Sequence, residues 1–295
     1  MRVGIGLPAA VPETDMTLIG RWAAEAERAG FESVGVIDRL IYDNLDPLTA
    51  LAAAAAGTSR IDLISTVVNV CWRNNPVLLA KQLSSVQRLS GGRLTAGLGM
   101  GGWPPDYEAS GVPLAGRGAL FDSSLATMQR TWEAAGERPR ILLGGTVRAS
   151  FARAATEMSE GWVAPLFGQD LLEEGAAAVR RAWGEAGRDG RPRIITGRYF
   201  SLGPDAGTVA DECIDHYYGP DFAEAARAGT LTEVEQIDAE LLRLSEAGCA
   251  DVLLFPCSGD PEQVSLLAQA LRATSSGNRQ FPRDAHPPTE RKAGA

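Results

Sequence analysis

The segment NPVLLAKQLSSVQRLSGGRLTAGLG (Asn75–Gly99) decides the fold of this chain. Asn75 and Pro76 suit the cap and the first position of a helix, and apolar residues at helical spacing follow them. A Gly-Gly pair then ends the helix, and the short apolar run Leu94–Leu98 comes next without in-out alternation. Such a run is typical of a parallel strand buried on both faces. The segment is therefore predicted to be one helix–strand unit of an α/β protein.

The same unit recurs along the whole chain. Short apolar runs predict eight strands: Val3–Leu7, Ser33–Ile37, Ile61–Val68, Leu94–Leu98, Ile141–Leu143, Gly161–Ala164, Arg193–Thr196 and Asp251–Phe255. Helical stretches separate them. Asp46-Pro47 stands where one helix should begin, and glycines such as Gly30 and Gly248 stand where helices should end. Eight strands alternating with helices predict a (β/α)8 TIM barrel, with a doubly wound open sheet as the alternative. We expect a single barrel domain over residues 1–273 and a polar, proline-rich, disordered tail over 274–295.

Composition excludes several classes of function. The 295 residues carry a net charge of −9, and no basic stripe with interleaved aromatic residues occurs, so nucleic acid is not an expected partner. No run of eighteen apolar residues predicts a membrane span, and the chain starts directly with a strand rather than with a targeting peptide. We therefore expect a cytoplasmic protein whose four cysteines are reduced thiols. Two histidines without ligand spacing predict no metal site and no Ser-His-Asp triad.

Two glycine-rich turns are candidate ligand sites. Gly97–Gly102 fits the G-x-G-x-x-G pattern of dinucleotide sites, but Pro104 and Pro105 are expected to prevent the helix that such a site needs. The turn is better interpreted as a strand end along which a flat ligand can lie, or as tight packing at a barrel mouth.

The second turn, at Gly144-Gly145, follows the fifth strand. Thr146 is predicted to cap the next helix, so that the amides of Gly145, Thr146 and Val147 would converge on a phosphate. An ordinary capped βα turn is the alternative interpretation.

These segments together resemble the bacterial luciferase-like superfamily of flavin- and deazaflavin-dependent (β/α)8 oxidoreductases. The likeness is carried by "NPVLLAKQLSSVQRLSGGRLTAGLGMGGWPPDYEASGV", "AERAGFESVGVIDRL" and "LLGGTVRASFARAATEMSEGWVAP", and it extends over nearly the whole barrel.

The resemblance implies a flavin ring at the carboxyl-terminal mouth of the barrel. Asp38 stands at the family's acidic position after the second strand. The third strand resembles the family's bulge with a non-proline cis peptide, which by position is expected at Val67–Val68. The residues that the resemblance assigns to cofactor binding are Asp38, Thr66, Val67, Val68, Gly99, Trp103, Gly144, Gly145, Thr146 and Val147.

The chain also departs from the family pattern. Arg39 stands where deazaflavin-dependent members often have histidine, and Gly102 and Pro105 stand near their glutamate and asparagine. Met100-Gly101 replaces the luciferase-type phosphate arginine. The crossover before the fifth strand is shortened, since "RTWEAAGERPRILLGG" passes from helix to strand in few residues. The site is therefore expected to be unusually open, or completed by a second subunit in a homodimer.

The resemblance implies a flavin-dependent monooxygenase that uses reduced FMN and O₂ on a small organic substrate. A separate flavin reductase would supply the reduced cofactor, because the chain has no nicotinamide module. Asp38 and Arg39 are the candidate catalytic residues, and Tyr42 and Trp103 are candidate walls. Arg39 could instead form a surface ion pair with Asp43, and Trp103 could be core packing.

Two other functions are open at this point. The first is hydride transfer with the deazaflavin coenzyme F420, suggested by the stretch "WRNNPVLLAK"; the second is non-catalytic flavin binding. A glycosidase is not expected, because Asp38 is the one carboxylate that follows a predicted strand.

Overall fold

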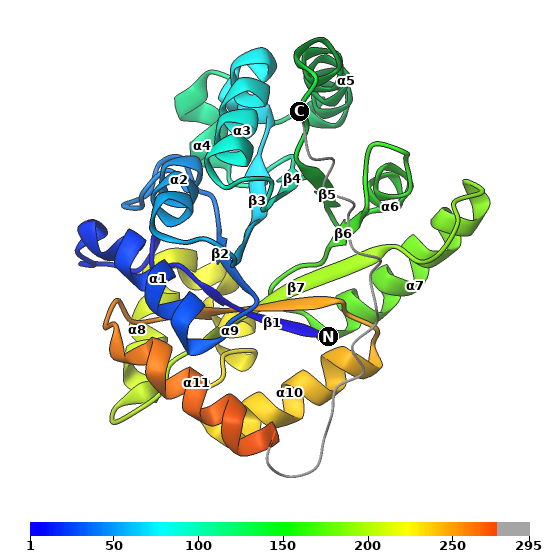
Figure 1. Cartoon of the computed structure of the whole chain (residues 1–295). Helices are drawn as coiled ribbons and strands as arrows, with labels where there is room; N and C mark the ends of the chain where they lie inside the picture. Colours follow the sequence, from blue (N-terminus) through cyan, green and yellow to red (C-terminus); the bar gives the residue numbers. More distant parts are fainter. Residues whose placement is uncertain (276–295) are drawn as a thin grey trace, which may run out of the picture.

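The computed structural model describes residues 1–275, and its centre is a closed parallel barrel (Figure 1). The eight strands pair in chain order, and β8 closes the ring on β1. Their bounds are β1 Arg2–Gly6, β2 Ser33–Val36, β3 Asp62–Asn69, β4 Leu94–Gly99, β5 Arg140–Gly144, β6 Gly161–Val163, β7 Arg193–Phe200 and β8 Asp251–Pro256. The predicted TIM barrel is thus confirmed, and the open sheet was the wrong alternative.

Helices surround the barrel on its outside (Figure 1). Their bounds are α1 Ile19–Ala29, α2 Pro47–Gly57, α3 Pro76–Leu89, α4 Pro104–Ser110, α5 Arg117–Ala135, α6 Arg148–Ala154, α7 Gln169–Glu185, α8 Ala206–Tyr218, α9 Pro220–Ala228, α10 Val234–Glu246 and α11 Glu262–Ser275. Two 3₁₀ turns, Met16–Leu18 and Cys71–Arg73, precede α1 and α3. Across residues 1–275, no helix combines the length and the apolar character that crossing a membrane requires.

Local sequence signals set several helix ends. The Asp46 carboxylate accepts hydrogen bonds from the amides of Leu48 and Thr49, and the Asn75 side chain accepts one from Leu78. Gly30 ends α1 in the left-handed conformation, with φ 96°, which glycine adopts without steric cost. These caps are the ones predicted from Asp-Pro, Asn-Pro and glycine positions.

Three local expectations were wrong. Pro104 and Pro105 do not prevent a helix but begin α4, because proline suits the first turn, where amides lack partners in any case. Strand β7 continues to Phe200, well beyond the expected Thr196. Helix α11 runs through Ser275, past the expected start of the tail at 274, and the rest of the predicted tail lies outside the described residues.

Side chains fill the inside of the barrel. Ile64, Leu142, Val163, Ile195 and Leu253 are buried there, in one apolar cluster that reaches to aromatic rings at the carboxyl-terminal end. A barrel filled in this way is a packed core and leaves its ligand site to the strand ends.

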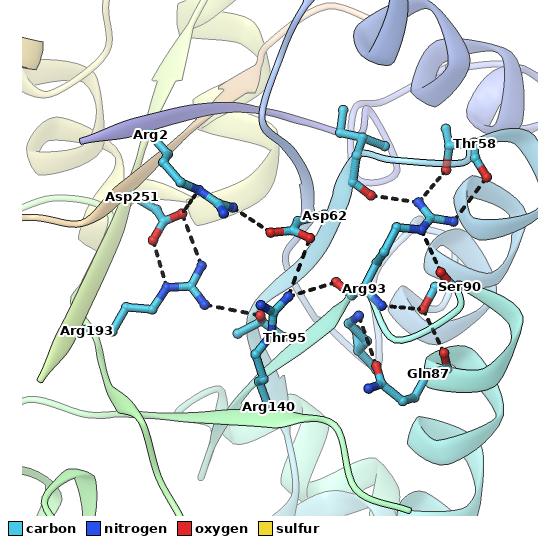
Figure 2. A network of polar contacts seen from close by, with 12 residues as sticks. Arg2, Thr58, Asp62, Gln87, Ser90, Arg93, Thr95, Arg140, Arg193 and Asp251 are labelled. Atoms are coloured by element: carbon cyan, nitrogen blue, oxygen red, sulfur yellow. Dashed lines mark hydrogen bonds and ion pairs between the residues drawn. The ribbon is translucent and has the colours of Figure 1, made fainter. Parts of the chain in front are cut away.

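Charged side chains close the amino-terminal end of the barrel (Figure 2). The buried Asp251 pairs with Arg193 at 2.8 Å and with Arg2 at 2.9 Å, and Arg2 also pairs with Asp62 at 2.7 Å. Burial would raise the pKa of Asp251, but the charges and hydrogen bonds of Arg193 and Arg2 outweigh burial and lower it. This network joins β1, β3, β7 and β8, so its role is to hold the ring closed.

Candidate active site at the carboxyl edge of the barrel

A bulge in β3 shapes the centre of the candidate site. The peptide bond between Thr66 and Val67 is cis, and the pairing of β3 with β4 shifts register between Ser65 and Val68. The cis bond therefore lies one residue earlier than the Val67–Val68 position expected from the sequence. Thr66 and Val68 are buried, whereas Val67 is half-buried at the mouth. The bulge thus presents the Val67 side chain toward the end of the barrel.

Two glycines make room beside Val67. A Cβ on Gly99, at the end of β4, would lie 2.5 Å from Val67 Cγ2, and one on Gly144, at the end of β5, would lie 2.9 Å from Val67 Cγ1. Either side chain would displace Val67. Three adjacent strand ends therefore form a low surface with Val67 as its raised centre, against which a flat ring can lie.

The Gly144–Val147 turn continues this surface outward. Helix α6 begins only at Arg148, after Val147, and no side chain caps it, so the expected cap by Thr146 was wrong. Thr146 and Val147 are exposed, and their amides have no hydrogen-bond partner within residues 1–275. The Ser150 hydroxyl is buried without a partner, and a Cβ on Gly145 would lie 2.3 Å from it. An unpaired hydroxyl and free amides at one turn fit an anionic group.

Asp38 lies two residues after the end of β2 and is almost fully buried. One carboxylate oxygen accepts a hydrogen bond from the Asn69 amide at 2.7 Å, and the other pairs with Arg73 at 3.0 Å. Burial raises the pKa of Asp38 to about 6, although Arg73 and the Asn69 amide act against this shift. Asp38 therefore fixes the chain just after the β3 bulge; its predicted catalytic role remains a prediction.

The raised pKa of Asp38 makes stability depend on pH. Because the folded pKa of about 6 lies above the unfolded value of about 4, the folded state binds the proton more tightly, and stability falls as pH rises through this window. Wild type should lose about 2–3 kcal/mol relative to Asp38→Asn between pH 4 and pH 7. Urea unfolding of both proteins across this range measures the difference. A constant difference would show that Asp38 titrates normally.

Arg39 is held inside the protein rather than on its surface. Its guanidinium pairs with the fully buried Asp106 of α4 at 3.2 Å, with side-chain exposures of 8% and 0%. Asp106 also accepts hydrogen bonds from the amides of Leu40 and Ile41. The alternative surface pair with Asp43 is therefore wrong, and the α4 carboxylate locks the loop after β2.

Aromatic rings surround Arg39. Its guanidinium lies 4.0 Å from the Trp103 ring centre and 5.5 Å from those of Tyr42 and Tyr217, in cation–π geometry. Trp103 also contacts Tyr218 and Phe222, from α8 and α9. The Trp103 ring, which was predicted as a wall of the site, is half-buried and packs against the Arg39 guanidinium.

The sequence did not indicate every residue that builds this edge. Asp106 and Arg73, the partners of Arg39 and Asp38, were missed because their separations of 67 and 35 residues leave no local pattern. The Tyr217-Tyr218 pair was also missed; two adjacent tyrosines before Gly219 were the available signal. His216 accompanies them at the rim, where its Nδ1 lies 2.7 Å from the Tyr42 hydroxyl. No group of three or more metal-ligating side chains occurs in residues 1–275.

The chain matches several curated proteins over part of their length. The chain is 30% identical over 172 residues to an uncharacterised protein of Mycobacterium tuberculosis, an alignment that covers 51% of this chain and 60% of the relative. It is 32% identical over 152 residues to an F420-dependent glucose-6-phosphate dehydrogenase of Beutenbergia cavernae, covering 44% of this chain and 40% of that protein. The chain thus spans about three fifths or less of these relatives.

Solved structures of the same fold cover nearly the whole chain. The monooxygenase RslO1 from Streptomyces bottropensis superposes with a TM-score of 0.74 at 21% identity, over 93% of this chain and 100% of that one. An F420-dependent secondary alcohol dehydrogenase, in complex with an F420–acetone adduct, gives 0.74 at 16% identity, over 92% and 98%. At these identities the likeness demonstrates the fold alone. A family model described as luciferase-like monooxygenase matches residues 1–276, so the chain belongs to the luciferase-like monooxygenase family.

Proposed function

We propose that the protein is an oxidoreductase that binds a flavin-type tricyclic cofactor across the carboxyl edge of its barrel. The observation that carries the proposal is the half-buried Val67, raised by the β3 bulge between the side-chain-free ends of β4 and β5. One half-exposed apolar side chain is ordinary by itself. Here, however, Val67 lies beside two strand ends that carry no side chain, and the three ends together leave a low apolar surface on which a flat ring can lie.

Different residues of this edge would contact different parts of the cofactor. Val67 would support the ring, while the amides of Thr146 and Val147 and the Ser150 hydroxyl would hold its phosphate. When bound, the cofactor supplies the two-electron chemistry. The protein's own contribution is to position the ring and to exclude water through the Trp103 and Tyr218 rings. Asp38 keeps the bulge in place through the Asn69 amide.

Coenzyme F420 is the first candidate cofactor. The observation in its favour is the 32% identity, over 152 residues, to an F420-dependent dehydrogenase; the solved F420-linked and FMN-linked structures, at 16% and 17% identity, do not separate the two cofactors. In this form the protein would pass a hydride to or from a small organic substrate.

FMN with O₂ is the second candidate. It is favoured by the family description and by the fold shared with the monooxygenase RslO1. This function would require a separate reductase to supply reduced FMN, and the aromatic rings around Trp103 would help to exclude water from the site.

Titration of the purified protein with each cofactor tests the proposal. We expect saturable binding of F420 with a Kd in the micromolar range, about −8 kcal/mol, followed by the change in deazaflavin fluorescence. Tighter binding of FMN, with oxygen consumption once FMN is reduced, would favour the second candidate. Tight binding of either cofactor without any turnover would instead support the hypothesis of a non-catalytic flavin-binding protein. If neither cofactor binds, the proposed function is wrong.

A further inference from the structure

A cavity of about 470 Å³ opens at the amino-terminal side of the barrel, where α7 and α10 lead into β7 and β8. Cofactor sites of barrels are built by the loops at the opposite end, so this cavity has no part in the proposed redox site. It is within the size range of ligand pockets. Its lining residues are Arg180, Trp183, Gly184, Arg188, Gly190, Arg191, Pro192, Glu246 and Gly248.

Glycines keep this cavity open. A Cβ on Gly184 or Gly190 would meet no heavy atom within 4 Å, so each glycine borders free space. Gly248 adopts φ 80°, and a Cβ there would lie 2.4 Å from a terminal nitrogen of Arg180. The missing side chain at Gly248 therefore lets the Arg180 guanidinium lie against the cavity wall.

Positively charged side chains predominate around the cavity, although the protein as a whole is acidic. Three arginines and one glutamate line it, whereas the whole chain carries a net charge of −9. Arg180 donates to the Ala247 carbonyl at 2.6 Å, and Arg188 donates to the Ser159 carbonyl at 3.1 Å and stacks on Trp183 at 4.0 Å. Backbone carbonyls hold these two guanidinium groups, and those of Ala247 and Ala155, at the ends of α10 and α6, offset part of their charge.

Across the described residues, Arg191 makes no comparable contact with the backbone. It is exposed in the loop between α7 and β7, and no hydrogen bond or ion pair joins it to another part of residues 1–275. Contacts with backbone carbonyls account for Arg180 and Arg188, whereas Arg191, the third arginine of the same cavity, makes no such contact within that range. An arginine fork offers several parallel donors, and the acceptor that matches it best is a carboxylate or a phosphate.

We propose that this cavity binds a compact phosphate-bearing anion, with Arg191 as its principal charged contact. Three arginines line this space, and within the part of the chain that the structure describes Arg191 has its guanidinium free of other partners, which favours the higher charge density of phosphate over a single carboxylate. A long polyanion such as nucleic acid does not fit, because the net charge of −9 repels it outside the cavity. An anion bound in the cavity would contact both α7 and α10, and so connect the two helices that precede β7 and β8.

Calorimetric titration of the full chain with pyrophosphate tests this site. At low ionic strength we expect a Kd at or below about 1 mM, weakening as salt screens the arginines. Arg191→Gln should weaken binding about tenfold or more. The matched control is Arg181→Gln, which removes the same charge from an exposed position of α7 that does not line the cavity, and it should bind like wild type. Inorganic phosphate and adenosine 5′-monophosphate form two further arms, and their relative affinities tell a free phosphate from an organic one.

The proposal fails if wild type shows no saturable binding of any of the three anions. It also fails if both variants lose affinity equally, because the effect would then follow net charge and not the cavity. Thermal midpoints of both variants should match wild type, which ensures that the comparison uses folded protein. The titrations need neither FMN nor F420. Because the Gly144–Val147 turn is also proposed to hold phosphate, only the affinity lost in Arg191→Gln is assigned to this cavity, and unchanged binding in Arg191→Gln contradicts the proposal.

Discussion

Asp251→Ala is expected to lower the free energy of unfolding by about 3–5 kcal/mol. The Asp251 side chain is 2% exposed and pairs with both Arg193 and Arg2 at the closed end of the barrel (Figure 2). The substitution leaves Arg193, itself 9% exposed, as a buried cation without its carboxylate. Urea unfolding at neutral pH measures the loss. Asp189→Ala, which removes an exposed aspartate of the loop before β7, should change stability by less than about 0.5 kcal/mol.

The stability that the Asp251 ion pairs contribute should decrease at acid pH. Because the folded pKa of Asp251 is lowered, its contribution is fully present above the unfolded value of about 4 and is lost as pH falls through the folded pKa. The difference in stability between wild type and Asp251→Ala should therefore shrink below about pH 4. A loss of less than about 1 kcal/mol at neutral pH would contradict the view that this network closes the ring.

Val67→Trp is expected to weaken cofactor binding about a hundredfold, equivalent to about 2.8 kcal/mol, with little change in stability. Val67 already lies within van der Waals reach of any side chain placed at Gly99 or Gly144, so a larger ring must project into the mouth. Its position is half-buried, which lets the indole extend outward without disturbing the core. Fluorescence titration with the cofactor that binds wild type gives the two affinities.

The control for this variant is Val77→Trp. Val77 is 51% exposed on α3, so the same substitution there adds a surface ring and should leave cofactor affinity unchanged. Thermal melting of both variants checks that they fold. Unchanged affinity in Val67→Trp would place the ring elsewhere and would remove the main support for the proposed site, whereas an equal loss in Val77→Trp would point to a nonspecific effect.

The barrel could be predicted from local patterns. Each strand reads as a continuous apolar run because both of its faces are covered, and the Asp-Pro, Asn-Pro and glycine signals act within a few residues of the helix ends that they define. The same locality explains the errors. Pro104-Pro105 was interpreted without the first-turn position that α4 gives it, and a cap was assigned to Thr146 although α6 starts at Arg148.

The candidate site was only partly predictable. Asp38, Val67, Gly99 and Gly144 were named from the resemblance to the luciferase-like superfamily, and the parallel strands bring them to one edge. The environment of Arg39 was not predictable, because its partner Asp106 follows 67 residues later.

By itself, the sequence determined the order of strands and helices, the ends of several helices and the edge of the barrel where polar and glycine residues gather. Hydrophobic periodicity and capping act over one or two turns, so the residues that carry them are neighbours along the chain. Only the tertiary structure decided that Arg39 is buried against Asp106, that Asp38 supports the β3 bulge and that three arginines share a cavity below the barrel. These features depend on burial and on charges brought together by ring closure, and free energies of that kind have no counterpart in a local pattern.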